Sequence, residues 1–465
     1  MTDTYLKQEK EGKKLKTKYN IIGLTGMRRK TSLFLLICTL LSVIAISLAG
    51  CDVSRLPTNN GGNQSVAESS SEIPEYFEDL IALDKFFKEH SYEGFDEEKM
   101  AEAILDAYVA ATGDIYAEYL NAEEYEAYFE ERAGEFVGIG VSIVNSEIEI
   151  GGAKYKTMEI ISVFKDSPAM ESGVMVGDHI TYVENNGEMQ LVNTLGYTNA
   201  LECMLGESGT AAKFIVYRKN GGDYEEVPFE ITRRKVESES VTYKVSETNR
   251  EVGIINITGF DLTTPTQFKE AVNFLRDVKK CKYFVFDLRN NPGGSLDSIE
   301  TVLSYFLNEG DEIVSTEYAD GTTESMVARV KRYYVDYSSL DVKKDEIGMY
   351  RDLDFIVLTN ENTASAAELF TATMRDYSLA KIVGKTTYGK GCMQTLYPLD
   401  SYGIPGGLKL TVAMYYSASK TVYHGTGIVP DYDVDLSDEA KKINFYILPE
   451  NMDAQMQKAI ELLTK

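Results

Sequence analysis

The sequence predicts a multidomain α/β protein, and three observations carry this prediction. The chain of 465 residues is long enough for roughly two to four domains. After residue 240, nearly continuous apolar runs alternate with helical patterns, which is typical of a layered α/β fold around a buried sheet. Before that point, a helical stretch and then a β-rich stretch indicate two smaller N-terminal parts.

Composition and charge exclude several classes of protein. A hydrophobic content of 43%, with 31 Tyr and 19 Phe, is too high for a mainly disordered chain. The formal charge of −26 would repel phosphate backbones, so we expect no nucleic-acid partner. Only three histidines occur, which leaves little material for a His-based triad or a multi-His metal centre. We therefore expect no metal and no cofactor, and a base other than histidine if the chain is a hydrolase.

The first 50 residues have the pattern of a secretory signal peptide. They carry nine basic and three acidic side chains, hence +6, whereas the other 38 basic and 70 acidic side chains give −32. The apolar run from Leu33 to Leu48 is shorter than a full membrane span. It leads into Leu48-Ala49-Gly50-Cys51, which resembles a bacterial lipobox with Cys51 as the lipidated first residue of the mature protein. A short transmembrane anchor is the alternative.

Either interpretation predicts a protein held on the cell membrane with its acidic body on the extracytoplasmic side. Residues 51–75 are rich in Ser, Asn, Gly and acids and have no apolar period, so we expect a lipid-anchored flexible tether. Residues 76–134 then show apolar side chains at spacings of three and four, which predicts a helical region. Its many acids are expected to form solvated faces.

Residues 135–236 predict a small β-rich domain. Turn residues separate short strand patterns at 136–144, 157–163, 179–183 and 212–218. The segment GIGV at 138–141, followed by SPAMESGVMVGDHITYVENNG at 167–187, resembles a PDZ domain. Such domains add an extended peptide to a sheet edge and bind its terminal carboxylate with backbone N–H groups. The resemblance implies that Gly138, Ile139, Gly140 and Val141 form the peptide-binding site.

Residues 237–465 predict the main α/β domain. Strands are expected at 252–257, 283–286, 355–358 and 381–384, and helices at 268–278, 297–306 and 365–376. The stretch GLKLTVAMYYS at 407–417 and the later Gly427-Ile428-Val429-Pro430 indicate added strands and a turn.

A serine at a strand-to-helix corner is the first candidate for chemistry. In TNENTASAAELF at 359–370, Ser365 lies where the strand ends and the helix begins. The unsatisfied N–H groups of the first helical turn, including that of Ala366, could face a developing oxyanion. Ser365 and Glu368 also fit a capping box that merely satisfies backbone donors, and this stretch alone leaves both interpretations open.

A lysine between glycines is the second candidate. Lys390 lies in TTYGKGCMQ at 386–394, where its flanking glycines allow close approach of another element and leave the amine little room for water. Burial disfavours an ammonium ion and lowers a lysine pKa, which makes the amine a usable base near neutral pH. The alternative is an ordinary solvated turn lysine.

Together these motifs resemble the carboxy-terminal processing peptidases, also called tail-specific proteases, of family S41. That family places its catalytic lysine 25 residues after its serine, as Lys390 follows Ser365 here, and a glutamine four residues further on, as Gln394. It has a glutamate three residues after the serine, here Glu368. Further ordered matches are GDIYAEYLNAEEYEAYF at 113–129, the PDZ-like segment, DLRNNPGG at 287–294 and GTGIVPDYDV at 425–434.

The resemblance implies a peptidase core of crotonase-like type with added β-strands, and a Ser-Lys dyad of Ser365 and Lys390. It implies that Glu368 and Gln394 orient the lysine and its loop, and that Gly293 or Gly294 binds the oxyanion together with Ala366. The expected activity is endoproteolysis of extracytoplasmic proteins at or near exposed C-terminal tails. The alternative is a catalytically inactive, PDZ-containing peptide-binding scaffold at the cell surface.

Overall fold

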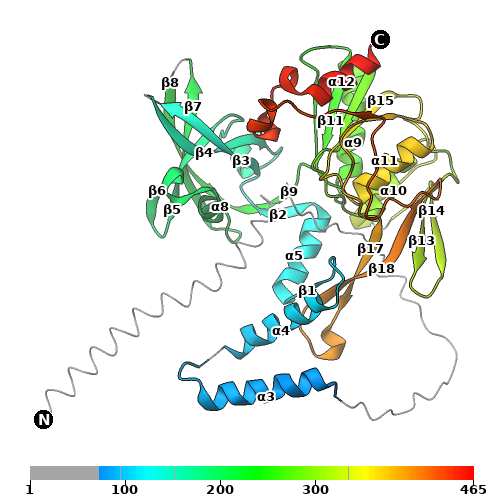
Figure 1. Ribbon diagram of the computed structural model, residues 1–465. Coiled ribbons are helices and arrows are strands. Elements are labelled where there is room, and N and C mark those ends of the chain that lie inside the picture. The colour runs from blue at the N-terminus through cyan, green and yellow to red at the C-terminus, as the bar shows by residue number, and fades with distance from the viewer. Residues whose placement is uncertain (1–72, 95, 151, 222, 334) are drawn as a thin grey trace, which may run out of the picture. The chain divides into compact units, whose positions relative to one another are not determined.

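The computed structural model describes residues 73–465, apart from residues 95, 151, 222 and 334 (Figure 1). The predicted signal peptide, Cys51 and nearly all of the predicted tether lie outside the described residues. Over the described range, none of the helices has both the length and the hydropathy that a membrane span requires. The described chain divides into two compact units, one of residues 126–393 and 412–465 and the other of residues 73–125 and 394–411.

The second unit combines the N-terminal helices with a distant β-hairpin. Helices α3 (Glu75–His90) and α4 (Glu97–Ala111) are followed by strand β1 (Glu118–Leu120), and α5 (Ala122–Ala133) runs on into the first unit. Strand β1 pairs antiparallel with the first residues of β18 (Gly407–Ser417). Helices α3, α4 and α5 confirm the predicted helical region. Strand β1 corrects it, because residues 118–120 follow the turn at 112–117 and their backbone groups find partners on β18.

The first unit contains a six-stranded sheet that is parallel except at one edge. Its order is β10-β11-β12-β15-β16-β19, and only β10 runs antiparallel to its neighbour. The strands are β10 (Val241–Val245), β11 (Val252–Ile257), β12 (Tyr283–Asp287), β15 (Asp354–Thr359), β16 (Lys381–Gly384) and β19 (Tyr432–Asp433). The four strands predicted in this region are confirmed to within about a residue, because each is a continuous apolar run buried on both faces.

Strand β12 shows how the two faces of this sheet are filled. The ring of Phe286 lies 4.7 Å from that of Phe355 and 6.1 Å from that of Phe370, on the face covered by α9 (Thr264–Asn273), α10 (Leu296–Ser304) and α11 (Ala366–Asp376). Val285 points to the opposite face and packs with Ile460 of α12 (Ala454–Leu463), which lies along the sheet in Figure 1. Because neighbouring side chains of a strand point to opposite faces, one short strand serves both cores.

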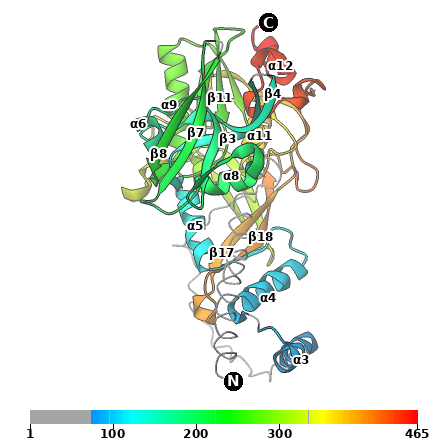
Figure 2. The same cartoon turned by 90° about the vertical axis from the view of Figure 1, so that its left-hand side faces the viewer.

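The strands predicted in the β-rich region form an antiparallel sheet with its own core. The sheet has the order β3-β4-β5-β7-β8, with β6 paired to β5, and Figure 2 shows α8 (Tyr197–Met204) packed against it. Its strands are β3 (Val141–Ile150), β4 (Ala153–Val163), β5 (His179–Asn185), β6 (Glu188–Leu191), β7 (Ala211–Asn220) and β8 (Asp223–Thr232), with α6 (Pro168–Glu171) and α7 (Val192–Leu195) between them. The ribbon β2 (Glu135–Gly138) and β9 (Arg234–Glu237) closes the region at its two ends.

The remaining strands join the C-terminal half. Strand β13 (Glu312–Tyr318) pairs with β14 (Thr323–Val327) on one side and with the end of β18 on the other. Strand β17 (Cys392–Pro398) also pairs with β18, so the expected added strand at 407–417 is confirmed. The chain passes from the first unit to the second within β17, and it returns within β18.

Candidate active site

Ser365 lies at the corner between β15 and α11, in a backbone conformation that is costly for a serine. Its dihedral angles are φ 54° and ψ −117°, and its exposed fraction is only 2%. Such a conformation persists only where the surroundings hold it. Here the preceding residue, Ala364, donates from its backbone N–H to the carbonyl of Asn291 at 2.9 Å, while the Ser365 carbonyl accepts the first helical bond from Leu369 at 2.8 Å.

The Glu368 carboxylate connects the serine corner to the lysine loop. Its Oε2 accepts from the backbone N–H of Ser365 at 3.0 Å and from that of Lys390 at 2.6 Å. Its Oε1 accepts from the hydroxyl of Thr387 at 2.5 Å and from the backbone N–H of Gly389 at 2.7 Å. The backbones of the two predicted catalytic residues therefore meet at a single oxygen atom, although 25 residues separate them in the chain.

Burial disfavours the charged form of Glu368. The side chain is fully buried, and loss of solvent raises its pKa even though four donors favour the charged form. A carboxylate with this many backbone donors does more than cap a helix. It holds residues 387–390 in one conformation relative to the start of α11.

Lys390 lies on a loop that is anchored on both sides. Its exposed fraction is 1%, so the alternative of a solvated turn lysine is wrong. A Cβ at Gly389, whose φ is +93°, would lie 2.8 Å from the backbone nitrogen of Gly427, which explains why a glycine precedes the lysine. The Thr387 hydroxyl accepts from the backbone N–H of Ile428 at 2.7 Å. The GTGIVP segment at 425–430 therefore packs against the lysine loop and is hydrogen-bonded to it.

The PGG turn of the DLRNNPGG motif packs directly on the serine. A Cβ at Gly293 would come within 2.8 Å of the Ser365 Cβ and 2.9 Å of the Ala366 nitrogen, so only glycine fits. The Gly293 N–H donates to Asn291 Oδ1 at 2.8 Å and is therefore engaged. Among the described residues, no protein acceptor receives a hydrogen bond from the N–H of Gly294 or Ala366.

Asn291 holds this turn in place through both ends of its amide. Besides accepting from Gly293, its side chain donates from Nδ2 to the Ile257 carbonyl at 2.8 Å, and it is fully buried. Its own carbonyl accepts from Ala364, the residue before the serine. The residue thus fixes the glycine turn to strand β11 and to the serine corner at once.

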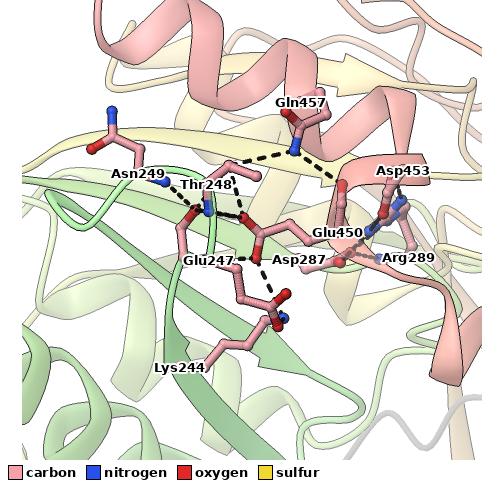
Figure 3. Close-up of polar contacts among 10 residues, drawn as sticks. Lys244, Glu247, Thr248, Asn249, Asp287, Arg289, Glu450, Asp453 and Gln457 are labelled. Atoms are coloured by element: carbon pink, nitrogen blue, oxygen red, sulfur yellow. Dashed lines mark hydrogen bonds and ion pairs between the residues drawn. The ribbon is translucent and has the colours of Figure 1, made fainter.

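An arginine earlier in the same motif ties it to the C-terminal helix (Figure 3). Arg289 donates to both oxygens of Asp287, at 2.9 and 2.6 Å, and its NH2 group lies 2.7 Å from Asp453 Oδ2. Asp453 also caps α12, because its Oδ1 accepts from the backbone N–H groups of Gln455 and Met456. Burial opposes the charge of Arg289, but the two carboxylates outweigh it and raise the arginine pKa. These ion pairs tie the DLRNNPGG motif to the start of α12.

A second carboxylate in Figure 3, Glu450, closes the C-terminal segment on the turn before β11. It accepts from the Ser246 hydroxyl at 2.5 Å, from the Thr248 hydroxyl at 2.9 Å and from the N–H groups of Glu247 and Thr248 at 3.2 and 3.1 Å. Lys244 lies 3.3 Å away and is half exposed.

The remaining predicted site residues are Gln394, the segment 138–141 and Cys51. Gln394 belongs to the second unit, where its Nε2 donates to Thr411 Oγ1 at 3.2 Å. In the predicted peptide-binding segment 138–141, Gly138 ends β2 and Val141 begins β3. The carbonyls of the two residues between them accept from Ala169 and Phe164 at 2.9 and 3.0 Å. Cys51 lies outside the described residues. No cluster of three or more His, Cys, Asp or Glu suited to a metal occurs in the part of the chain that the structure describes.

Comparison with known proteins decides the class of this site. The model of Peptidase family S41 matches residues 251–434, which include Ser365, Glu368 and Lys390 and the glycine turn. The segment that carries these residues is similar to the peptidases of family S41. The predicted enzyme class, a serine-type peptidase, is therefore confirmed.

Relatives extend the similarity beyond the peptidase segment. The chain is 29% identical over 382 residues to the carboxy-terminal processing protease CtpA of Bacillus subtilis (strain 168), covering 82% of this chain and 74% of that one. It is 30% identical over 352 residues to a probable CtpA-like serine protease of Staphylococcus aureus (strain N315), covering 76% of this chain and 63%, or less than two thirds, of that relative. A crystal structure of a putative S41 protease from Bacteroides fragilis shares the fold, with a TM-score of 0.51 at 20% identity over 80% of this chain and 92% of that one.

Two residues of the site were missed by sequence reasoning. Thr387 and Asn291 both lie inside the quoted motifs, yet they were given no role. A threonine or an asparagine next to glycines is common in any turn, so the sequence carries no signal that distinguishes a side chain bonded to two elements from a solvated one. The contacts that give these residues a role are made with residues far away in the chain.

Proposed function

We propose that this protein is a serine endopeptidase that cuts extracytoplasmic proteins at or near their C-terminal tails with a dyad of Ser365 and Lys390. The observation that carries the proposal is the shared Glu368 oxygen, which brings the backbones of these two residues together at a glycine turn. Similarity to the family and the name of the Bacillus subtilis relative support the substrate class.

The reaction begins when the neutral amine of Lys390 takes the Ser365 hydroxyl proton as Oγ attacks the peptide carbonyl carbon. The N–H groups of Ala366 and Gly294 stabilise the negative oxygen of the tetrahedral intermediate. Gly294 is the better partner of the two glycines, because the Gly293 N–H is already bonded to Asn291. The Lys390 ammonium then protonates the leaving amine as the C–N bond breaks and an acyl-enzyme forms. In the second half of the reaction, Lys390 takes a proton from the water that attacks the acyl-enzyme. It then returns a proton to Ser365 Oγ as the acyl product leaves.

In this proposal the β-rich region is a PDZ domain that captures the substrate tail on β3. Strand β3 is an edge strand that pairs only with β4 among the described strands, so one side of its backbone is open to an added strand. Its apolar side chains share a core with those of α8. The GIGV turn would bind the terminal carboxylate through its N–H groups. The carbonyls of Ile139 and Gly140 accept from Ala169 and Phe164 and so hold the turn in place. Glu368 and Gln394 would orient the lysine loop, and a lipid on Cys51 would hold the enzyme on the outer side of the membrane.

The dyad is tested with the full-length chain and an unfolded reporter protein that ends in an apolar tail. Ser365→Ala and Lys390→Ala should each abolish cleavage. Ser378→Ala, at another serine with positive φ, and Lys385→Ala, in the same loop, should leave cleavage near the wild-type rate. Cleavage that survives Ser365→Ala would refute the dyad, whereas a wild-type chain that binds the reporter without cutting it would favour the inactive scaffold.

Tail capture is tested with the same enzyme and a pair of peptides that differ only at their ends. A free C-terminal carboxylate should give a lower KM than an amide, because backbone N–H groups can bind the charged group but gain little from the amide. Equal KM values for the two peptides would contradict capture of the tail by its carboxylate.

A further inference from the structure

Asp114 is the second residue of a motif, GDIYAEYL at 113–120, for which neither the sequence nor the peptidase site supplies a role. Its side chain is bonded to Thr411 on β18 and to the backbone that follows it. Its Oδ2 accepts from the Thr411 backbone N–H at 2.9 Å, and its Oδ1 accepts from the Thr411 hydroxyl at 3.0 Å and from the N–H of Tyr116 at 3.0 Å. Burial works against the charge, but the bonds from Thr411 and Tyr116 outweigh it and lower the pKa of Asp114. The carboxylate is therefore ionised at neutral pH.

The ionised carboxylate determines where the Thr411 proton lies. A carboxylate only accepts hydrogen bonds, so the Thr411 hydroxyl must donate its single proton to Asp114. The same hydroxyl oxygen lies 3.2 Å from the Gln394 side chain, and it must act there as an acceptor. Gln394 consequently turns its NH2 end to Thr411 and its carbonyl oxygen the other way. The orientation of this amide follows from the hydrogen-bond chemistry.

We infer that Asp114 is a positioning residue for peptide cleavage, which acts through Thr411 to fix the orientation of the Gln394 amide. The inference rests on the proposed function, in which Gln394 serves the catalytic lysine four residues before it. An amide oxygen accepts a hydrogen bond from an amine, whereas an amide NH2 group does not. With the amide reversed, Gln394 would present a donor where the lysine needs an acceptor. The three residues all belong to the second unit.

Four variants of the full-length chain test this relay. Asp114→Asn replaces one accepting oxygen by a donor, so that it conflicts with an N–H or with the hydroxyl proton of its partners. Thr411→Val keeps the branched shape of the side chain but removes the hydroxyl. We expect each change to lower kcat for the tailed reporter by about 10- to 100-fold with little change in KM. Thr411→Ser keeps the hydroxyl and should retain most of the activity.

The matched control is Glu118→Gln, which makes the same carboxylate-to-amide change in the same unit. Glu118 pairs with the buried Lys409 on β18, two residues from Thr411, but it does not contact Gln394. This variant should lower the thermal unfolding temperature at least as much as Asp114→Asn while kcat stays within about threefold of wild type. A loss of kcat equal to that of Asp114→Asn would overturn the relay, because it would show a general effect of loosening the unit.

The double variant Asp114→Asn with Thr411→Val separates a relay from two independent effects. If both residues act through the same bond to Gln394, the double variant is no slower than the slower single variant. If the two losses multiply, or if Thr411→Val keeps the wild-type kcat, the inference is wrong. Failure of the proposed function itself gives a different result, because the reporter would then still be cut by the Ser365→Ala protein.

Discussion

Two buried glutamates, Glu368 at the candidate active site and Glu450 at the C-terminal segment, hold loops in the same way but differ in the effect on their own charge. Each accepts four hydrogen bonds from backbone N–H and hydroxyl groups, three of those at Glu368 and all four at Glu450 coming from one short loop. Burial is the largest influence on both pKa values. It prevails at Glu368, which is fully buried, and the pKa rises. At Glu450, which is 5% exposed, the donors prevail and the pKa falls.

The difference shows that the geometry around Glu368 has a cost, because its charged form is disfavoured by burial. Glu450 makes a stabilising contact at low cost, because Lys244 lies nearby and some solvent remains. Glu368 is excluded from water, so its charged form is tolerated only because four donors point at it, from Ser365 and from the loop 387–390. We interpret Glu368 as a residue selected for holding the serine and the lysine loop together, and Glu450 as one that stabilises the fold.

A third buried cluster, around Arg289, should have the largest effect of the three on the free energy of unfolding. Arg289→Met should lower the free energy of unfolding by about 3 to 5 kcal/mol, because it leaves Asp287 and Asp453 buried together without a cation. The measurement is the urea unfolding midpoint of the full-length chain. Lys282→Met, which removes an exposed partner of Glu251, is the control and should shift the midpoint by less than about 1 kcal/mol.

Glu368→Gln should cause a larger loss of activity than Glu450→Gln. The new NH2 group must face N–H donors of either Gly389 or Lys390, so the lysine loop moves away from Ser365. We expect kcat for the tailed reporter to fall by about 100-fold. Glu450→Gln should keep kcat within about threefold of wild type. Equal losses in the two variants would contradict the assignment of Glu368 to the site and Glu450 to the fold.

Glu450→Gln should instead act on stability. The amide leaves one or two of the donors at Ser246, Glu247 and Thr248 without an acceptor, which costs about 1 to 3 kcal/mol in the free energy of unfolding. Loss of the ion pair with the half-exposed Lys244 adds little to this. The urea midpoint measures the change, and an unchanged midpoint would show that Glu450 contributes nothing to holding the C-terminal segment.

The pH dependence of stability should separate the two glutamates with opposite signs. The lowered pKa of Glu450 means that its contribution is present above the ordinary glutamate pKa and is lost as the pH falls through the folded value. The raised pKa of Glu368 means that its contribution is greatest at low pH and is lost as the pH rises through the folded value. Between pH 7 and pH 4, the stability difference between wild type and Glu450→Gln should shrink. Over the same range, the stability of wild type relative to Glu368→Gln should increase. If both differences moved in the same direction, the comparison would be contradicted.

Much of the fold could be read from local patterns. The parallel strands at 252–257, 283–287, 354–359 and 381–384 are continuous apolar runs, and such runs have few alternatives to a buried strand. The edge strands β8 and β14 were not predicted, because many of their side chains face solvent and mixed polarity weakens the pattern. Helix α12 was not predicted, although Met456, Ala459 and Ile460 have helical spacing.

The spacing of Ser365, Glu368, Lys390 and Gln394 and the DLRNNPGG motif are local features of the chain, so the resemblance to the family and the candidate residues could be recognised before the fold was known. How those residues are held depends on contacts that form only when the chain folds. The meeting of Ser365 and Lys390 at one Glu368 oxygen, the Asn291 bond that occupies the Gly293 N–H, and the relay from Asp114 through Thr411 to Gln394 each join residues from distant segments. Hydrogen bonds depend on distance and direction within a few tenths of an ångström, and no pattern along the chain encodes that.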